Sequence, residues 1–268
     1  MSILVIGAYG TVGSRVAAGL RSAGIPIRGS SRKPETTESP GLEMVRLDLD
    51  EPETLPAALD GIDKVFLYSV PEHIAEFVGA AQAAGVEHVV LLSSCAVVEP
   101  VAQRTRAAQI HSAVEQAVRE SGIAWTFLRP TTFATTRLHW AQAIRSGEEL
   151  RIPFLRMETA AIHERDIADV AVRALTGDGH AGKGYWLTGP QAMTQREHAE
   201  TIAAVTGRSV DVAEMSPEDV GNLPAPFVRT MTERMNAPCV VTSTVEEVTG
   251  TPARSFRQWV EDHIADFS

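Results

Sequence analysis

Three glycines near the N-terminus constrain the fold of this chain more than any other feature. Gly7, Gly10 and Gly13 follow one another at intervals of three, after the apolar run ILVI and before a helical pattern. Between a strand and a helix, this spacing is typical of a turn that holds a dinucleotide. The first glycine allows a tight turn, the second lets the backbone approach a pyrophosphate, and the third lets the helix pack close to the strand.

The helix after these glycines supplies the second part of the predicted site. From about Thr11 and Val12, its first N–H groups and its dipole favour a phosphate group. We expect Tyr9 to line the same turn. The alternative is a glycine-rich structural turn without a ligand, but the position between a strand and a helix favours the cofactor.

Strand-like and helical patterns alternate through the first two thirds of the sequence. Several strand-like runs are continuously apolar, as in strands that helices cover on both faces. Repeated β–α–β order predicts an α/β protein with a parallel, doubly wound sheet of the Rossmann type. The expected strands are residues 3–7, 25–31, 43–49, 64–70, 88–94, 124–130, 184–189 and 209–216, with a further short strand at the start of residues 160–177.

The regular alternation of strand-like and helical patterns ends after Pro130, where loops, short strands and helices follow in a less regular order. We therefore predict a dinucleotide-binding domain over residues 1–155. Residues 156–268 are expected to form the remaining strands and a smaller, mostly helical lobe that binds substrate. Ligands of open α/β sheets bind at the carboxyl ends of the strands, so this lobe should cover that crevice.

Composition narrows the class of partner. The 268-residue chain has a formal net charge of −10, which argues against a nucleic-acid or anionic-membrane surface. Its two cysteines, Cys95 and Cys239, form neither a disulfide framework nor a metal motif. No long apolar run or charged leader is present in the sequence, so we expect a cytoplasmic protein. A monomer or homodimer acting on a small molecule, without a metal, is the predicted form.

Residues after the second and third expected strands indicate which dinucleotide binds. An NAD site usually has an acidic residue after the second strand, whereas this chain has Ser31, Arg32 and Lys33. A planar Arg fork with small hydroxyls suits a 2′-phosphate, so NADP(H) is favoured over NAD(H). The alternative is an ordinary solvated loop. After the third strand, Asp48 is expected to accept from the adenine amino group, and Leu49 to pack on the ring.

Polar residues leave the expected central strands at their carboxyl ends, where they should border the nicotinamide. Tyr68 and Ser94 are predicted to hydrogen-bond a substrate carbonyl, and their alternative role is to face water. Cys95 is assigned to the substrate site, although a cysteine there is more often a buried filler. The further residues assigned to the cofactor are Ser69, Ser93 and Pro130.

Five motifs link the chain to a known family: GAYGTVG, SSRKPE, LDLDEPETL, AAQAAGVEHVVLLSS and HSAVEQAVRESGIAWTFLRP. Together they resemble the NmrA-like group of atypical short-chain dehydrogenase/reductases. The C-terminal VTGTPARSFRQWVEDH resembles the festuclavine and agroclavine dehydrogenase-like branch, which belongs to secondary metabolism. The resemblance implies NADPH-dependent reduction of ketones, quinones, enones or imines. The same group also contains catalytically silent proteins that sense NADP(H).

The proton donor of classical short-chain dehydrogenases is absent from this sequence. Those enzymes use a Tyr-x-x-x-Lys pair, in which the Tyr gives a proton to the carbonyl oxygen. The three tyrosines are Tyr9, Tyr68 and Tyr185, and none has a Lys four positions later. An ordinary alcohol dehydrogenase or a classical sugar-nucleotide epimerase is therefore not expected.

His111 is the best substitute for the missing donor. By its offset from GIAWTFLRP, it falls where the resemblance to isoflavone-reductase-like proteins implies a catalytic Lys. A His donates protons near neutral pH, and Glu115, one helical turn later, could orient it. The alternative is a His that caps or packs its helix.

The predicted substrate lobe contributes Thr131, Phe133, Trp140 and Phe154, with Phe227 as a further possible wall. For Trp140 and Phe227, an ordinary core position is an equal alternative. The predicted function is an NADPH-dependent reductase of a C=O or C=N bond in an apolar aromatic or polycyclic molecule. An iminium substrate would need no proton donor. The alternatives are an NADPH:quinone reductase and a non-catalytic NADP(H) sensor, which would need no deep apolar pocket.

Overall fold

The computed structural model describes residues 1–33 and 42–268. Residues 34–41 lie outside that description, and with them the last two residues of the SSRKPE motif. The chain divides into two compact units that are discontinuous in sequence. The first unit comprises Met1–Val97, Arg106–Pro130 and Glu164–Trp186, and the second comprises Val98–Thr105, Thr131–His163 and Leu187–Ser268. The domain boundary predicted near residue 155 stays a prediction.

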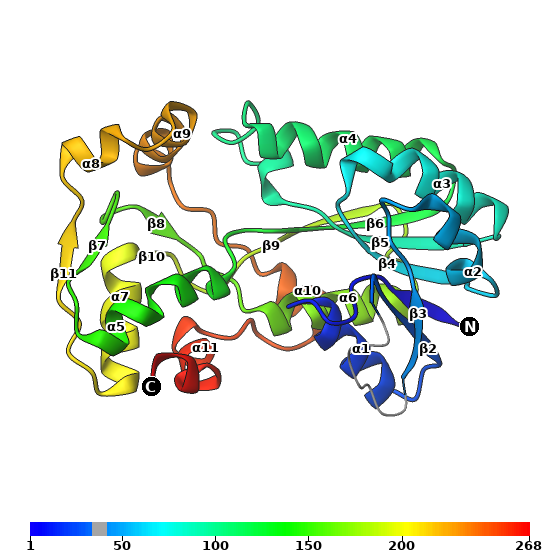
Figure 1. The fold of residues 1–268 in the computed structure, drawn as a ribbon, viewed down its shortest axis with the longest axis horizontal. Coiled ribbons are helices and arrows are strands. Elements are labelled where there is room, and N and C mark those ends of the chain that lie inside the picture. The colour runs from blue at the N-terminus through cyan, green and yellow to red at the C-terminus, as the bar shows by residue number, and fades with distance from the viewer. Residues whose placement is uncertain (34–41) are drawn as a thin grey trace. The chain divides into compact units, whose positions relative to one another are not determined.

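The first unit is built on a seven-stranded sheet, and the predicted doubly wound fold is confirmed (Figure 1). Ile3 pairs in parallel with Ile27 on one side and with Lys64 on the other, so the chain order reverses across the first strand. A reversal of this kind is the topological switch point at which α/β proteins bind nucleotides. In spatial order the strands are β3 (Glu43–Arg46), β2 (Ile27–Ser31), β1 (Ile3–Val5), β4 (Lys64–Tyr68), β5 (His88–Leu92), β6 (Ala124–Pro130) and β9 (Lys183–Leu187).

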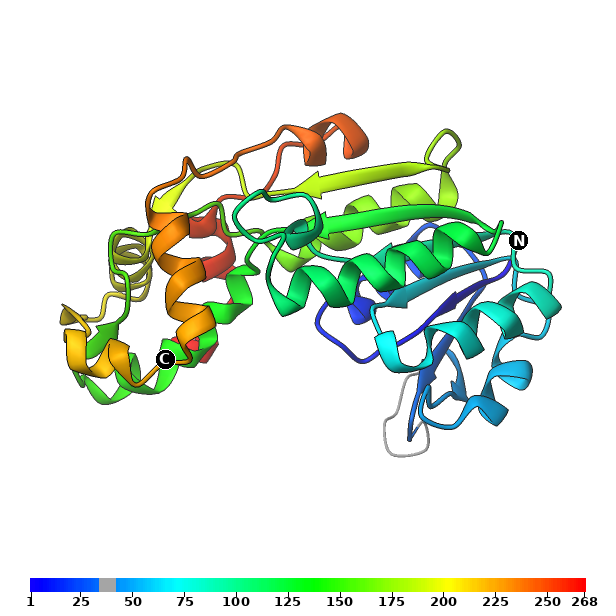
Figure 2. The same ribbon diagram turned by 90° about the horizontal axis from the view of Figure 1, so that it is seen from above.

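Helices cover both faces of this sheet, which explains why its central strands are continuously apolar. All three residues of β1 are fully buried. In Figures 1 and 2, α3 and α4 run along one face, and α1 and α6 lie on the other. The helices of this unit are α1 (Gly13–Ser22), η2 (Pro52–Thr54), α2 (Leu55–Leu59), η3 (Pro71–His73), α3 (Ile74–Ala83), η4 (Cys95–Val97), α4 (Arg106–Glu120) and α6 (Glu164–Thr176).

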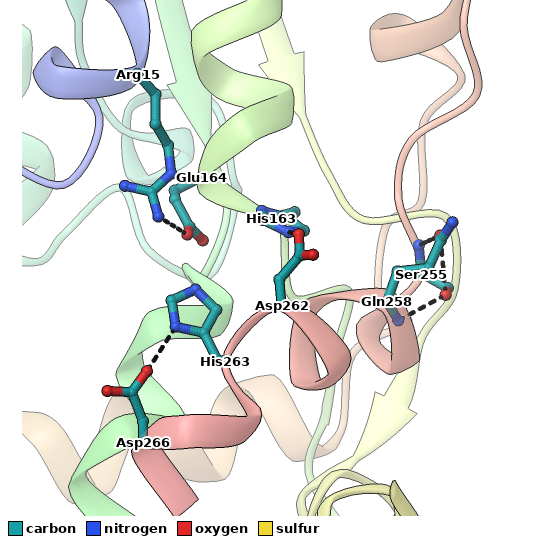
Figure 3. Close-up of polar contacts among 8 residues, drawn as sticks. All are labelled: Arg15, His163, Glu164, Ser255, Gln258, Asp262, His263 and Asp266. Carbon is teal, nitrogen blue, oxygen red and sulfur yellow. Dashed lines mark hydrogen bonds and ion pairs between the residues drawn. The ribbon is translucent and has the colours of Figure 1, made fainter. Parts of the chain in front are cut away.

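A buried charge joins the two helices on the second face. Glu164 begins α6 and is fully buried. Its carboxylate accepts from Arg15 of α1 at 2.7 Å, as Figure 3 shows. Because a buried carboxylate needs a partner, this ion pair fixes the start of α6 against the first turns of α1.

The second unit is mostly helical around a small core that contains Trp259, Phe267, Ile152 and Trp140. Short strands hold its loops: β7 pairs in parallel with β11, and β8 pairs antiparallel with β10. Its elements are η5 (Ala134–Trp140), α5 (Ala141–Ser146), β7 (Leu150–Ile152), β8 (Glu158–Thr159), β10 (Met193–Thr194), α7 (Gln195–Thr206), β11 (Val212–Glu214), α8 (Pro217–Gly221), α9 (Ala225–Met235), α10 (Thr244–Thr249), α11 (Phe256–Asp262) and η6 (Ile264–Phe267).

Local sequence signals set the ends of several helices in this unit. The Ser255 side chain accepts from the Gln258 backbone, and the Gln258 side chain accepts from the Ser255 backbone at 2.8 Å, a reciprocal cap visible in Figure 3. At the end of that helix, Asp262 contacts the buried His163 at 3.1 Å. Such caps satisfy the free N–H groups of a first helical turn. Within the described ranges, every helix is too short or too polar to cross a lipid bilayer.

Candidate functional site

The glycine turn has the geometry that the sequence predicts. Gly7 has a φ of +72°, and its carbonyl accepts from the Gly10 N–H at 2.8 Å. A Cβ built on Gly13 would lie 2.2 Å from the Gly7 oxygen, far inside van der Waals contact. The start of α1 therefore packs directly on the turn, and only glycine permits this approach.

This turn fits the phosphates of a dinucleotide. Among the residues that the structure describes, no side chain caps the N-terminus of α1, where Val12 is the N-cap, so the first turn of the helix presents backbone groups. A Cβ built on Gly10 would lie 3.2 Å from the Gly7 oxygen, so glycine at this position keeps the surface of the turn free of a side chain. Backbone N–H groups and the helix dipole are the usual ligands of a pyrophosphate. Thr11 is exposed beside them.

The end of β2 carries the residues predicted to select the nucleotide. Ser30 is buried, and its hydroxyl has no hydrogen-bond partner among the residues that the structure describes. The Ser31 hydroxyl accepts from the Lys33 N–H at 3.2 Å. Arg32 and Lys33 are exposed. No acidic residue stands at positions 30–33, so this edge offers cations and hydroxyls to a ligand.

Tyr68 shows that the ends of four strands share one edge of the sheet. Its ring would lie 3.2 Å from a Cβ built on Gly7. Burial raises the pKa of its phenol, the charge of Arg32 lowers it, and the charge of Asp48 raises it. The structure therefore brings Gly7, Arg32, Asp48 and Tyr68 together, as the sequence predicts. Leu49 is buried in the core, and its contact with an adenine ring stays a prediction.

His111 on α4 is held by Ser69 at the end of β4. The Ser69 hydroxyl donates to the Leu92 carbonyl at 3.1 Å and lies 2.8 Å from the His111 Nδ1. Because its only proton is used on Leu92, Ser69 accepts from Nδ1–H, and Nε2 of the neutral ring is an acceptor. Burial lowers the pKa of His111, which the charge of Glu115 partly opposes. The ring therefore donates a proton from Nε2 only when it is an imidazolium.

Glu115 has a different role from the one expected. Its side chain accepts from the Ser93 hydroxyl at 2.7 Å and from Arg129 Nε and Nη2 at 2.8 and 2.6 Å. The bidentate pair fastens α4 to β6, and Ser93 ties both to the end of β5. Orientation of His111 thus comes from Ser69, which the sequence assigned to the cofactor. An Arg inside the apolar run AWTFLRP was the sequence signal for a buried carboxylate partner.

The remaining predicted residues of the first unit are ordered around η4. The Ser94 hydroxyl accepts from the Ala96 N–H at 3.2 Å and stays half-buried. Cys95 is buried at the start of η4. This position fits a residue that packs in the core and also a residue that lines the substrate site. Pro130 ends β6 and is buried. The assignments of Ser94, Cys95 and Pro130 to substrate or cofactor stay predictions.

The predicted substrate residues belong to the second unit. The Thr131 N–H donates to Leu187 at 2.9 Å, and Phe133 forms an isolated bridge with Ile162. Trp140 is buried in the hydrophobic core of the unit, which is the alternative given for it above. Its contact with substrate has no direct support in this packing.

Phe154 has the backbone conformation of a strained residue. Its φ is +55°, the single positive value outside glycine among the described residues. Its ring meets that of Phe227 edge-on at 6.5 Å between centroids, and Phe227 is exposed. Residues held in the left-handed region cluster at binding sites, because the surrounding structure must compensate the strain. This favours Phe154 and Phe227 as an aromatic wall.

Comparison with known proteins agrees with this geometry. Residues 7–178 match the model of a family described as NAD(P)H-binding. The chain is 40% identical to a (4-alkanoyl-5-oxo-2,5-dihydrofuran-3-yl)methyl phosphate reductase of Streptomyces griseus and 37% identical to an NAD(P)H azoreductase of Xenophilus azovorans, with 99% of each chain covered. A festuclavine dehydrogenase of Aspergillus fumigatus is 28% identical over 99% of this chain and 98% of its own. The expected likeness to the NmrA-like group and to its ergot-alkaloid branch is confirmed.

A solved structure extends the comparison to the fold. The triphenylmethane reductase of Citrobacter sp., crystallised with NADP(H), superimposes with a TM-score of 0.81 at 24% identity, and the match covers 98% of this chain and 99% of that one. At this level of identity the likeness concerns the fold alone. It supports the Rossmann-type topology described above.

Proposed function

Since the chain belongs to the NAD(P)H-binding family, we propose that it is an NADPH-dependent reductase of small molecules. The acceptor is a C=O or C=N bond, or a quinone, in an apolar aromatic or polycyclic compound. The observation that carries the proposal is the close contact between Gly13 and the Gly7 carbonyl, which keeps the turn free of side chains where a pyrophosphate binds. When bound, NADPH supplies the hydride.

The choice of NADPH over NADH rests on the end of β2. Arg32 and Lys33 would bind a 2′-phosphate, with Ser31 beside them, and no carboxylate is there to accept from a ribose hydroxyl. A guanidinium holds a phosphate through two parallel N–H donors. The buried Ser30 hydroxyl, which has no partner among the described residues, is a further donor at this edge.

His111 is the proposed proton donor for carbonyl substrates. Addition of a hydride to a ketone leaves an alkoxide, which takes one proton to become the alcohol. The imidazolium of His111 gives that proton from Nε2 and keeps the Nδ1 proton on Ser69. Because burial lowers the pKa of His111, carbonyl reduction should accelerate as the pH falls toward that pKa. An iminium acceptor needs no such proton.

The relatives leave the identity of the acceptor open among several classes. Their names cover a furanone phosphate ester, azo compounds, festuclavine and, in Escherichia coli, quinones. These acceptors share a polarised or electron-poor double bond. A non-catalytic NADP(H) sensor is the second candidate, favoured by the absence of a Tyr-x-x-x-Lys pair.

Two measurements separate these candidates. Fluorescence titration with NADPH and NADH measures binding, and loss of NADPH absorbance with ketones, quinones, azo dyes, cyclic imines and a furanone phosphate ester measures turnover. We expect binding of NADPH, weaker binding of NADH, and turnover of at least one class. Tight NADPH binding without turnover of any class would favour the sensor.

A matched pair of glycine variants tests the site itself. Gly13→Ala places a Cβ 2.2 Å from a backbone oxygen, whereas a Cβ at Gly79 on α3 meets nothing within 4 Å. We expect Gly13→Ala to lose NADPH binding and Gly79→Ala to keep it. Equal binding by the two variants would contradict the assignment of the turn.

A further inference from the structure

Arg137 in η5 of the second unit is a buried cation with neutral neighbours. The residue is 4% exposed. Its Nη1 donates to the Thr136 hydroxyl at 3.1 Å and its Nη2 to the Thr159 hydroxyl at 3.2 Å, while the Trp140 ring lies 4.9 Å from the guanidinium carbon. Two N–H donors of this guanidinium are thus given to hydroxyls, and the buried Nε has no acceptor among the described residues.

No carboxylate of the described chain compensates this charge. The hydrogen bonds of Arg137 go to threonine side chains, and burial alone lowers its pKa to about 10. Near neutral pH the guanidinium therefore remains charged. An isolated buried charge is unfavourable in a folded protein, so a site that keeps one usually pairs it with a counter-ion.

The buried polar side chains of helix α7, His198 and Gln195, are neutral groups. His198 is fully buried, with its Nδ1 2.9 Å from the Thr194 carbonyl. Burial and the charge of Arg137 lower its pKa to about 3, so the ring stays neutral. Its Nε2 and the Oε1 of Gln195, one helical turn earlier, have no partners among the described residues. An ordered water could fill these positions, but water does not neutralise the charge.

We propose that Arg137 binds an anionic group of the substrate, a phosphate monoester or a carboxylate. The Nε and Nη2 donors lie on one edge of the guanidinium, which matches two oxygens of such a group. The Thr159 hydroxyl bonded to Nη2 can turn to donate to the same anion. The assignment to substrate rests on the proposed reductase function, whereas anion binding by Arg137 does not.

Anion binding is measured on the protein saturated with NADP⁺, so that phosphate cannot bind at the glycine turn or at Arg32. Inorganic phosphate, methyl phosphate and acetate are titrated by calorimetry and by thermal unfolding, with chloride at equal ionic strength as the reference. We expect one of these anions to bind and to raise the melting temperature. The phosphate and acetate arms distinguish a phosphate ester from a carboxylate.

Three variants attribute the binding to Arg137. Arg137→Met removes the charge at similar volume, and Arg137→Lys keeps the charge but loses the fork. Arg151→Met is the matched control, because Arg151 is exposed and already paired with Glu149 and Asp219. We expect affinity for the anion to fall on the order of tenfold or more in both Arg137 variants, and to be unchanged in the control. If Arg137→Met fails to fold, Arg137→Lys still shows whether anion binding depends on the guanidinium.

Kinetics then connect the anion to the substrate. The KM of Arg137→Met should rise on the order of tenfold for an anionic acceptor and stay unchanged for a neutral quinone. Anion binding that survives in both Arg137 variants, or no binding in the native protein, overturns the proposal even if quinones are reduced. Arg137-dependent binding in a protein that reduces nothing supports the anion site and counts against the reductase.

Discussion

Each unit contains an arginine with little exposure to solvent, the partly buried Arg129 in the first and the buried Arg137 in the second, and the two differ in what surrounds them. Arg129 in the first unit forms a bidentate pair with the buried carboxylate of Glu115. Arg137 in the second unit contacts two threonine hydroxyls and no carboxylate of the described chain. The first arrangement is complete without a ligand and holds a helix to a sheet. The second arrangement lacks a negative charge beside the arginine, and an anionic ligand would supply that charge.

At the proposed reductase site, Glu115 has both a structural and a chemical role. Glu115 carries the internal ion pair and raises the pKa of the neighbouring His111 by its charge. One carboxylate thus contributes to packing and to the protonation of a proposed donor. Because the first effect is measured as stability and the second as the pH profile of the reaction, they can be measured apart.

Glu115→Ala should have the largest effect on stability. It leaves the partly buried Arg129 without its carboxylate partner, and removal of one member of a buried ion pair costs up to about 3–5 kcal/mol. Urea unfolding at neutral pH measures the loss. A loss below about 1 kcal/mol, the range of exposed pairs, would show that Arg129 reaches solvent and that the comparison with Arg137 is wrong.

His111→Ala should have the next largest effect, and it concerns activity. Loss of a general acid lowers the rate on the order of 100-fold, so we expect this decrease in kcat for ketones and little change for cyclic imines. Single-turnover oxidation of bound NADPH measures both. Equal loss for the two acceptor classes would mean that His111 positions the substrate and does not donate a proton.

The charge of Glu115 can be tested through the same reaction. Glu115→Gln keeps the shape of the side chain and removes the charge that raises the pKa of His111. The pH profile of ketone reduction should therefore move to lower pH, since the imidazolium becomes the donor only at higher acidity. Gln82→Glu on α3 alters an exposed position bonded to Ser121 and is the control, with no expected shift.

His198 should make the second unit sensitive to acid. Its pKa of about 3 in the folded protein is below the value of about 6.5 for an unfolded chain. The unfolded state therefore binds a proton first, and stability is lost as the pH falls from about 6.5 toward 3. Between pH 7 and pH 5 the expected loss from this residue is about 2 kcal/mol.

The measurement compares the native protein with His198→Leu, because His88, with its own pKa lowered to about 4, is present in both. The native protein should lose more stability than the variant over this pH range. Parallel pH profiles would show that His198 has the same pKa in the folded and unfolded states, which would contradict its burial beside an uncompensated Arg137.

The sequence predicted the first unit better than the second for a physical reason. Strands β1, β4 and β5 are mostly apolar and closely follow their expected ranges, because helices on both faces favour that pattern. β7 was not predicted, since it has three residues and pairs with β11 more than fifty residues later. A strand so short has no periodicity of its own.

In the candidate site, too, features set by neighbouring residues were predicted, and contacts between distant segments were not. The spacing of Gly7, Gly10 and Gly13 is a local signal, and the structure has the turn that it predicts. The contact of Ser69 with His111 and the pair of Glu115 with Arg129 join segments far apart in sequence. Arg137 carried no signal, because RTRAAQ and ATTRLHW both contain an arginine and only packing shows which one is buried.

Arg137→Met should have the smallest effect on stability, and the sign of the effect matters. Replacing a buried charge by an apolar side chain of similar volume is often neutral or stabilising. In buffer without phosphate we expect the free energy of unfolding to change by less than about 1 kcal/mol, or to increase. In saturating phosphate the native protein should become the more stable of the two, since only it binds the anion. A large loss in both buffers would mean that the threonine contacts and Trp140 already make Arg137 a structural residue, as Glu115 does for Arg129.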